Sequence, residues 1–531
     1  MEDVENSISQ IFRNTNTVER SDFMFYRVLS AVVLGLQVHS VQVEVDVSDG
    51  LPSFIMVGYL SSQVREAQDR VRTALRNSGL ALPPKRITVN LSPADIRKDG
   101  TGFDLPIAAA ILCALGKVPE DSLKNVFLSG ELGLNGEIHF VRGILPMIIN
   151  ARDEGCRLCI VPAENLAEAE VVEGITSIGI NHLNELIAFL RHGDVPDSEE
   201  IQKVDIMQSY EEDFADIYGQ DTLKRAALIA VSGFHNMLLI GPPGAGKSML
   251  AKRIPTILPA MTKEESLEIS RIYSVAGLLS PDRPFVGKRP YRAPHHTSTA
   301  QALAGGGMIP KPGEITLAHR GVLFLDELPE FTRHSLEILR QPLEEKVINI
   351  SRSSGTYTFP ANFLLFAAMN PCPCGYFMDR NRCRCTPGEI SRYQKKISSP
   401  LLDRIDICME VEQVPYEALA SNKKGSVTSA ELREMAERVF EIQQKRYQGT
   451  GIHFNSELKA SMLADFCPLE EGAQKLLKRA FVKFQMSARA YHRIVRVART
   501  IADLDGKEII SSAHISEAIQ CRCIDQTYWN L

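Results

Sequence analysis

Residues 241–248 read Gly-Pro-Pro-Gly-Ala-Gly-Lys-Ser and decide the fold, because they match the phosphate-loop pattern G-x-x-x-x-G-K-[ST]. The apolar run Met237–Ile240 precedes them as a buried strand would, and residues 249–254 follow with helical spacing. Glycines let backbone N–H groups turn toward a polyphosphate, and the N-terminus of the following helix adds partial positive charge. The lysine would reach the outer phosphates, and the serine hydroxyl would bind Mg²⁺. The predicted residues of this nucleoside triphosphate site are Gly241, Pro242, Pro243, Gly244, Ala245, Gly246, Lys247 and Ser248.

Two further apolar runs end in polar side chains that suit the same chemistry. The run Gly321–Leu325 leads into Asp326 and Glu327. Asp326 could hold Mg²⁺ through water, and Glu327 could polarise the attacking water. The run Leu364–Met369 ends in Asn370, whose amide could orient the nucleophile beside the γ-phosphate. Either run could instead lead into an ordinary turn, but the position downstream of a phosphate loop favours catalysis.

The composition is that of a globular protein with several domains. A chain of 531 residues, 44% hydrophobic and 23% charged, is too long for one core. Its net charge of −6 gives no global attraction for nucleic acid, so such binding would need local basic surfaces. Eleven unevenly placed cysteines argue against a disulfide scaffold and favour a reducing compartment. No run approaches the roughly 18 apolar residues of a membrane span. We therefore expect a cytoplasmic protein without membrane association.

The N-terminal third alternates strands and helices. Residues 1–23 are expected to form a flexible tail. Val41–Val47 and Ile87–Leu91 alternate apolar and polar residues, as half-buried strands do. A helix is predicted after Ser61 and Ser62, and a second one from Leu105 to about residue 115. This order predicts an α/β or α+β domain over residues 24–190.

Three segments of this domain, residues 97–112, 129–147 and 159–165, resemble the proteolytic domain of Lon-type proteases. The resemblance implies a Lon-protease-like (ribosomal S5 domain 2-like) α+β fold. In that family a serine follows the Asp-Gly loop and a lysine lies further along the chain. Here the serine position falls on Gly102, and the lysine position lies among Leu145, Pro146 and Met147. Without a nucleophile and an amine there is no covalent mechanism, so we expect a binding or assembly platform that is not a protease.

The remaining chain is predicted to form a linker and two further domains. Residues 191–213 are polar and acidic, as linkers are. Residues 214–415 would form the α/β core around the phosphate loop, with a cysteine-rich insertion at 372–385. Residues 416–531 carry apolar stripes at helical spacing and would form a helical lid. The order of phosphate loop, Asp-Glu strand and Asn-ended strand resembles AAA+ ATPases.

The resemblance becomes more specific in residues 292–307, 311–331 and 399–407, which resemble magnesium-chelatase-like AAA+ ATPases of the ComM/YifB type. It covers nearly the whole chain and implies ATP as the nucleotide. By this resemblance Arg404 occupies the arginine-finger position, although it could instead pair with a neighbouring aspartate. Arg489 occupies the sensor-2 position of the lid, where Arg493 and Arg496 compete on spacing alone. The family also implies hexamers, in which a finger from one subunit completes the next subunit's ATP site.

Four cysteines form the pattern C-x-C…C-x-C within the predicted insertion. Their thiolates could bind Zn²⁺ tetrahedrally and so order a loop with little core of its own. The pairs are closer together than in the usual C-x₂-C, and reduced surface thiols are the alternative. The candidate zinc ligands are Cys372, Cys374, Cys383 and Cys385.

Three segments could contact DNA. Basic and aromatic residues between Cys372 and Arg404 could neutralise phosphates and stack on bases, although solvated loops have similar compositions. In the wider branch of AAA+ proteins that this chain resembles, DNA contacts come from insertions corresponding to residues 304–309 and to a hairpin at about 347–359. His295–His296 lie nearby and are expected to be structural or nucleotide-sensing.

The resulting hypothesis is an ATP-driven hexameric motor on single-stranded or branched DNA, with helicase or branch-migration activity in recombination or natural transformation. The alternative is a magnesium-chelatase-like motor that remodels a protein partner. The predicted catalytic residues are Glu327, Asn370, Arg404 and Arg489.

Overall fold

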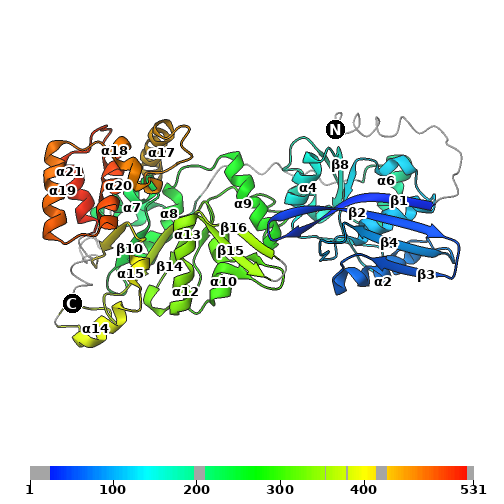
Figure 1. Ribbon diagram of the computed structural model, residues 1–531, viewed down its shortest axis with the longest axis horizontal. Helices are drawn as coiled ribbons and strands as arrows, with labels where there is room; N and C mark the ends of the chain where they lie inside the picture. The colour runs from blue at the N-terminus through cyan, green and yellow to red at the C-terminus, as the bar shows by residue number, and fades with distance from the viewer. Residues whose placement is uncertain are drawn as a thin grey trace. The chain divides into compact units, whose positions relative to one another are not determined.

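The computed structural model describes residues 24–196, 210–352, 355–377, 379, 381–413 and 427–522. The chain divides into two compact units (Figure 1). Unit 1 comprises Met1–Ile206, Ser266–Val286 and Ile309–Lys311, and unit 2 comprises the remainder. The predicted tail 1–23 and residues 197–209 of the predicted linker lie outside the described residues. Sequence analysis placed residues 266–286 in the ATPase core, whereas their contacts are with unit 1.

Unit 1 is built on a seven-stranded mixed sheet in the order β3-β4-β2-β1-β5-β8-β9. β2 pairs antiparallel with both β1 and β4, and the remaining neighbours pair in parallel. In β2 the valines at 41, 43, 45 and 47 are buried while intervening residues are more exposed, which confirms the predicted alternation. The strands are β1 (Met24–Leu34), β2 (Gln37–Ser48), β3 (Ser53–Val57), β4 (Arg86–Ser92), β5 (Val126–Leu128), β8 (Leu158–Pro162) and β9 (Thr176–Ile180).

Helices cover this sheet as the apolar spacing predicts. The helix α2 is capped by Ser61, whose side chain accepts a hydrogen bond from the Val64 N–H, and it buries one apolar face. All eleven residues of α3 are buried. A small hairpin pairs β6 (Glu131–Leu132) with β7 (Ile138–His139). The helices are α2 (Ser62–Asn77), α3 (Asp104–Ala114), α4 (Ile144–Asp153), α5 (Leu166–Ala169), α6 (Leu183–His192) and most of α9 (Lys263–Ala276).

Unit 2 contains a five-stranded parallel sheet in the order β11-β14-β17-β10-β18. The central neighbours β10 and β17 pair so that Ile240 lies opposite Met369, and β14 pairs with the other side of β17. The carboxyl ends of these three strands therefore meet at one edge, where open α/β sheets bind ligands. The strands are β10 (Met237–Ile240), β11 (Tyr291–Arg292), β14 (Val322–Leu325), β17 (Leu364–Met369) and β18 (Ile407–Glu410).

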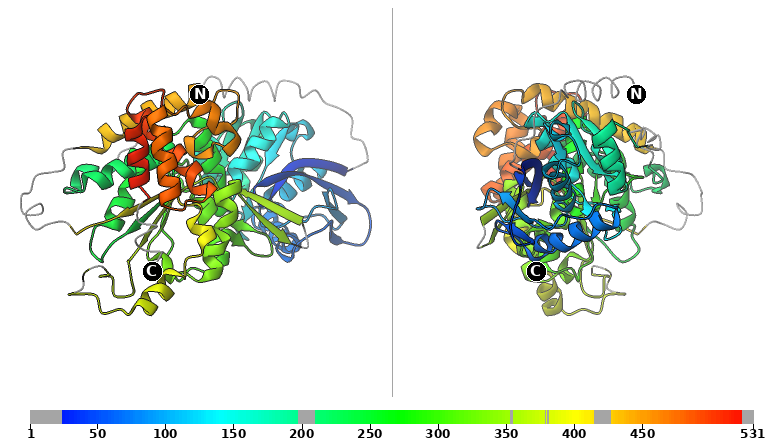
Figure 2. Two further views of the ribbon diagram at one scale, coloured as in Figure 1. Left: turned by 60° about the vertical axis from the view of Figure 1, so that its left-hand side comes forward. Right: turned by 90° about the vertical axis from the view of Figure 1, so that its right-hand side faces the viewer.

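Helices flank the sheet, and two hairpins accompany it. The phosphate loop connects β10 to α8 (Lys247–Ile257), and α7 (Asp221–Gly233) precedes β10. The predicted hairpin consists of β15 (Val347–Arg352) and β16 (Gly355–Pro360), and its tip residues 353–354 lie outside the described part. Figure 2 shows α14 in yellow at the margin of the unit. The other elements are α10 (Ala300–Ala304), β12 (Gly305–Gly306), β13 (Lys311–Pro312), α11 (Glu314–Leu317), α12 (Arg333–Ile338), α13 (Arg340–Glu345), α14 (Pro387–Gln394) and α15 (Ser399–Leu402).

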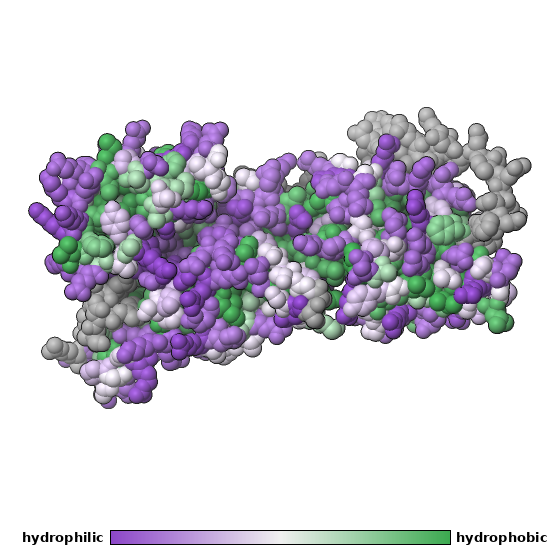
Figure 3. All heavy atoms as spheres, in the orientation of Figure 1, coloured by the Kyte–Doolittle hydropathy of each residue, from purple (hydrophilic) through white to green (hydrophobic). Residues whose placement is uncertain are grey.

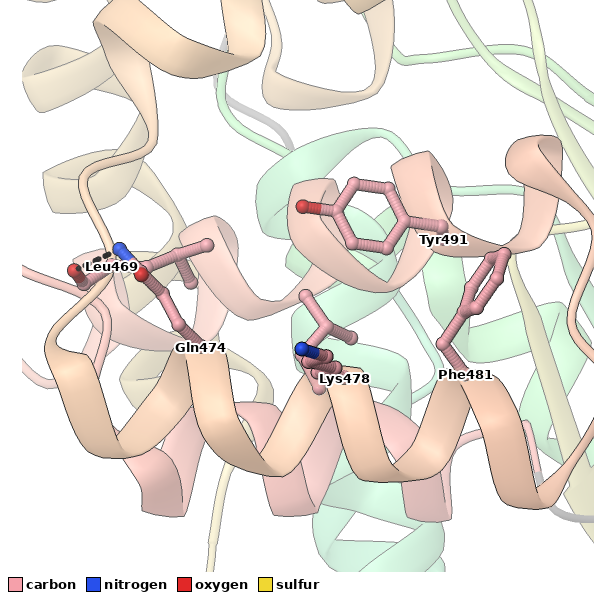
Figure 4. A pocket seen from close by; sticks show the side chains of 6 residues that line it. Leu469, Gln474, Lys478, Phe481 and Tyr491 are labelled. Atoms are coloured by element: carbon pink, nitrogen blue, oxygen red, sulfur yellow. Dashed lines mark hydrogen bonds between the residues drawn. The ribbon is translucent and has the colours of Figure 1, made fainter.

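The C-terminal part of unit 2 is helical and shares one hydrophobic core with the sheet. Its longest apolar face belongs to α20, where Ile494, Ala498 and Ile501 are buried with residues of α7 and α17. A shallow hollow of about 420 Å³ lies between α19 and α20, and Phe481 and Tyr491 line it (Figure 4). The helices are α17 (Ser429–Arg446), α18 (Leu463–Phe466), α19 (Glu471–Lys483), α20 (Ala488–Leu504) and α21 (Ser512–Gln520).

The face shown in Figure 3 is mostly hydrophilic, with scattered apolar side chains, as is normal for a protein in water. None of the helices in the described ranges has both the length and the apolar composition that a bilayer crossing needs.

Candidate active site

The phosphate loop needs its glycines for backbone reasons. A Cβ at Gly241 would collide with the carbonyl oxygen of Val411. Gly244 and Gly246 have φ angles of +76° and +90°, in the left-handed region that favours glycine. α8 begins at Lys247 without a side-chain cap on its N-terminus. The first N–H groups of α8 therefore face the loop, where an anion would find unsatisfied donors and the positive end of the helix dipole.

The Lys247 ammonium group lies at the centre of the site. Its Nζ donates to the carbonyl oxygens of Gly241 and Pro242, at 2.6 and 3.0 Å, and to Asn370 Oδ1 at 3.1 Å. Burial lowers the pKa of Lys247, while the Asp326 and Glu327 carboxylates act in the opposite direction. The structure thus brings together the lysine of the phosphate loop and the asparagine at the end of β17. A bound polyphosphate could take over the two carbonyl contacts.

Ser248 and Asp326 form the second predicted pair. The Ser248 hydroxyl donates to Asp326 Oδ2 at 2.7 Å, across the edge where β10 and β14 end. Asp326 Oδ1 accepts a hydrogen bond from the Glu327 N–H at 2.9 Å, which orients the carboxylate. Hydroxyl and carboxylate oxygens are the ligands that Mg²⁺ prefers. The donor set therefore fits a magnesium ion, which Ser248 and Asp326 would hold.

Glu327 is held by a residue to which sequence analysis gave no catalytic role. Its backbone has φ +49° and ψ 45°, an uncommon conformation for a residue with a side chain. The turn leaves the Glu327 side chain 55% exposed, with Oε2 3.1 Å from Nδ1 of His296. His296 in turn lies against the rings of His295 and Phe331. The sequence held no periodic signal for this contact, because the two partners belong to separate loops.

Arg404 and Arg489 form a separate group around the end of α15. The Arg404 guanidinium is largely buried and pairs with Glu344 of α13, rather than with the neighbouring aspartates considered from sequence. Arg489 is exposed, and its Nη1 lies 3.4 Å from Asp403 Oδ2. Its competitor Arg493 is buried and donates to the Ile405 carbonyl oxygen at 3.1 Å. Of these two lid arginines, Arg489 is the one accessible to a ligand or another chain.

The four predicted zinc ligands lie together in the loop between β17 and α14. All four Sγ atoms are within 4.8 Å of one another. The Sγ–Sγ distances are 3.3 Å from Cys372 to Cys374, 3.8 Å from Cys372 to Cys383 and 3.6 Å from Cys374 to Cys383. Burial raises the pKa of Cys374, but hydrogen bonds from the Tyr376 N–H and the neighbouring thiols lower it to about 6. The cluster could hold a metal ion.

In unit 1 the positions of the Lon dyad are occupied by packing residues. A Cβ at Gly102 would lie 2.7 Å from Ser129 Oγ and 3.2 Å from Val141 Cγ1, so a serine there would require a shift. The lysine position falls in the buried start of α4, where the Leu145 N–H donates to Glu168 Oε1 at 3.0 Å. Neither position carries a nucleophile or an amine.

Comparison with known proteins agrees with this arrangement over nearly the whole chain. Residues 213–419 match the family model "Magnesium chelatase, subunit ChlI", residues 43–165 match "Subunit ChlI of Mg-chelatase", and residues 426–522 match "Magnesium chelatase, subunit ChlI C-terminal". The chain is 42% identical to "Competence protein ComM" of Haemophilus influenzae, over 94% of this chain and 97% of that protein. It is 40% identical to "Uncharacterized protein YifB" of Escherichia coli K12, over 93% and 96%.

The chain belongs to the ComM/YifB family of magnesium-chelatase-like AAA+ proteins. A weaker match, 31% identical over 24% of this chain and 22% of the relative, links it to Lon protease 2 of Bacillus subtilis. These matches confirm the predicted family and fold class, a Lon-like front part followed by an AAA+ α/β core and helical lid. As a member of the ComM/YifB family the protein is an oligomeric AAA+ ATPase that uses ATP and Mg²⁺.

Proposed function

We propose that this protein is a hexameric, ATP-hydrolysing motor that acts on DNA as a helicase or branch-migration factor, in recombination or natural transformation. The observation that carries the proposal is the group formed by Lys247, Ser248, Asp326, Glu327 and Asn370 at the carboxyl edge of a parallel sheet. The role in DNA transactions is supported by 42% identity to a relative named as a competence protein.

Each residue of the site would have a separate role in phosphoryl transfer. Lys247 would leave the Gly241 and Pro242 carbonyl oxygens and donate to the outer phosphates. Ser248 and Asp326 would hold Mg²⁺, which supplies charge neutralisation when bound. Glu327 would release His296 and accept hydrogen bonds from the attacking water, beside Asn370. Each role uses an atom that already lies at the edge of the sheet.

Oligomerisation would complete the site. Arg404 pairs with Glu344 within its own chain, and Arg489 stays exposed beside Asp403. Exchange of Glu344 for a neighbour's γ-phosphate would bring a guanidinium to the charge that develops in the transition state, where such a finger contributes roughly 10³–10⁵-fold. Arg404→Ala should therefore keep nucleotide binding and ring assembly but lose hydrolysis in the ring.

We also propose that the cysteine cluster binds zinc. Four sulfurs at the corners of a tetrahedron with Zn–S bonds of ~2.3 Å are ~3.8 Å apart. The observed separations of 3.3–3.8 Å approach this value. A disulfide would need sulfurs ~2.05 Å apart. The geometry favours a tetrathiolate ion over oxidised cysteine pairs.

The decisive experiment measures ATP hydrolysis by the purified protein without DNA, with single-stranded DNA and with a four-way junction, and records the oligomeric state in each condition. The proposal expects hexamers and a rate that rises with DNA. Glu327→Gln serves as the hydrolysis-deficient control that still binds ATP. Full activity of a monomer would overturn the shared site, and a rate indifferent to every DNA would overturn DNA as the substrate.

The second candidate is a chelatase-like motor that remodels a protein partner. It is favoured by the match of residues 213–419 to a magnesium chelatase subunit. This candidate would be favoured if the hexamer hydrolysed ATP at a rate that changes with a copurifying protein and does not change with DNA.

A further inference from the structure

The cysteine loop is packed directly on the phosphate loop. Gly375, which ends the turn containing Cys372 and Cys374, has φ +85°, and a Cβ there would lie 2.6 Å from Cδ of Pro243. The Gly375 N–H donates to the Cys372 carbonyl oxygen at 3.0 Å. The turn that carries the first two cysteines is thus pressed against a residue of the nucleotide-binding loop, with room only for glycine.

A second path joins the other cysteine pair to the same loop. Arg382, which precedes Cys383, stacks on the Tyr376 ring at 3.9 Å and donates to Gln413 Oε1 at 3.3 Å. The carbonyl oxygen of the adjacent Glu412 accepts from Gln220 Nε2 at 3.1 Å. The same amide donates to the Ala245 carbonyl oxygen, also at 3.1 Å. The first cysteine turn therefore contacts Pro243 directly, and the second is linked to Ala245 through Gln413, Glu412 and Gln220.

The cysteine loop has almost no core to hold this shape. Among its described residues from 371 to 386, only Pro371, Cys372 and Gly375 are buried. Ordering such a segment costs conformational entropy that apolar burial does not offset here. A tetrathiolate ion would cross-link both turns at once, because structural zinc sites supply folding free energy directly.

We propose that zinc bound by Cys372, Cys374, Cys383 and Cys385 holds the cysteine loop against Pro243, and so fixes the phosphate loop in its nucleotide-binding conformation. This inference rests on the zinc proposed above, and it makes the metal a part of the ATP site. Gly375 and the cysteines act as positioning residues, because Gly375 packs on Pro243 and the cysteines would fix the turn that carries Gly375. Zinc loss should weaken ATP binding itself, independently of any effect on hydrolysis or on DNA binding.

The test uses the full-length Glu327→Gln protein, in which binding is separated from turnover, with no DNA present. Zinc per chain is measured by inductively coupled plasma mass spectrometry, and affinity is measured with a fluorescent ATP analogue and Mg²⁺. Three added changes are compared: the pair Cys383→Ser and Cys385→Ser, then Gly375→Ala, and then Gly388→Ala. Gly388 is the matched control, because a Cβ there meets no atom within 4 Å.

The cysteine pair should lose zinc and bind the analogue roughly tenfold or more weakly, since small displacements of a binding loop have effects of this size. Gly375→Ala should keep zinc and still lose affinity, and Gly388→Ala should keep both. To exclude simple misfolding, zinc is removed from the otherwise unchanged Glu327→Gln protein with a chelator and then restored, and affinity should fall and return with it.

Two outcomes overturn the proposal: a parent protein that contains no zinc, or zinc-free protein that binds the analogue with unchanged affinity. If ATP binding depends on zinc but DNA does not stimulate hydrolysis, only the proposed action on DNA is contradicted. The failure of the zinc proposal and the failure of the DNA motor are therefore distinguishable.

Discussion

Unit 2 contains a candidate ATP site, whereas in unit 1 the positions that correspond to the Lon dyad are filled by packing residues. In unit 2 the glycines of the phosphate loop allow its left-handed turns and its close approach to Val411, and Lys247 is surrounded by oxygens that a nucleotide could replace. In unit 1 Gly102 makes no space, because Ser129 and Val141 already fill the position of a nucleophile's side chain. The comparison shows that a glycine in a recognisable motif has to be judged by its surroundings, which are backbone turns in the phosphate loop and packed side chains at Gly102.

Each unit contains a buried charged side chain, Lys247 in unit 2 and Glu168 in unit 1, and the two have different kinds of partner. Lys247 shares its surroundings with carboxylates and an amide that suit phosphoryl transfer. In unit 1 the buried carboxylate of Glu168 accepts hydrogen bonds from the Leu145 N–H, from Asn165 and from the hydroxyl of Ser274 in α9. The Gly143 N–H also donates to the Ser274 carbonyl oxygen. The region of unit 1 that corresponds to the Lon dyad therefore anchors α9.

The largest effect is expected from a change in the candidate ATP site of unit 2. Lys247→Ala removes the only ammonium group that contacts Asn370 in the described structure, and it should abolish ATP binding and lower turnover by roughly 10³-fold. The matched control is Lys252→Ala, which changes an exposed lysine on the same helix. Isothermal titration with ATP measures binding, and a steady-state hydrolysis assay measures turnover. Retained ATP binding would contradict the assignment of the site.

A smaller effect is expected at His296. Its imidazole is the partner of Glu327, so His296→Ala should lower kcat about tenfold and leave ATP affinity unchanged, since only the proposed base loses its orientation. His295→Ala is the comparison: its ring lies 4.1 Å from that of His296, but its hydrogen bond goes to Thr297 and not to Glu327, so it should lower kcat less. Single-turnover hydrolysis and equilibrium ATP binding provide the two readouts. A change confined to affinity would show that His296 acts on the nucleotide and not through Glu327.

The contrast between the units also explains what the sequence could and could not predict. The phosphate loop, Asp326 and Asn370 were predictable because each follows an apolar strand within a few residues. The contacts of His296 with Glu327 and of Arg404 with Glu344 join segments far apart in the chain, and such contacts leave no periodic pattern in the sequence. Sequence analysis included residues 263–276 in the ATPase core by their position in the chain, and it held no signal that most of α9 belongs to unit 1.

In unit 1 the expected effect is on stability and not on chemistry. Gly102→Ser restores the residue type of a Lon nucleophile but places a Cβ 2.7 Å from Ser129 Oγ, so it should destabilise unit 1 by about 1–3 kcal/mol. It should create no peptidase activity and leave ATP hydrolysis unchanged. Adding Ser129→Ala removes the colliding hydroxyl and should recover part of the loss. Chemical denaturation and a casein-cleavage assay are the measurements, and peptide cleavage by the single variant would contradict the filled-site interpretation.

The smallest effect is a pH dependence of the α9 anchor. Burial raises the pKa of Glu168, although its hydrogen bonds to Ser274, Leu145 and Asn165 oppose this. Between the ordinary value of 4.5 and the raised pKa, the folded unit binds a proton that the unfolded chain lacks. The free energy of unfolding of this part of unit 1 therefore falls as pH rises from 4.5 through the raised pKa of Glu168. It is greatest below pH 4.5.

Glu168→Gln removes the titration, so amide hydrogen exchange in α4 and α9, corrected for intrinsic rates, should lose this part of its pH dependence. Glu164→Gln, at an exposed position nearby, should retain it. An unchanged pH profile in Glu168→Gln would mean that the carboxylate does not control how tightly α9 is held. The anchor would then rest on the Gly143–Ser274 backbone hydrogen bond and apolar contacts alone.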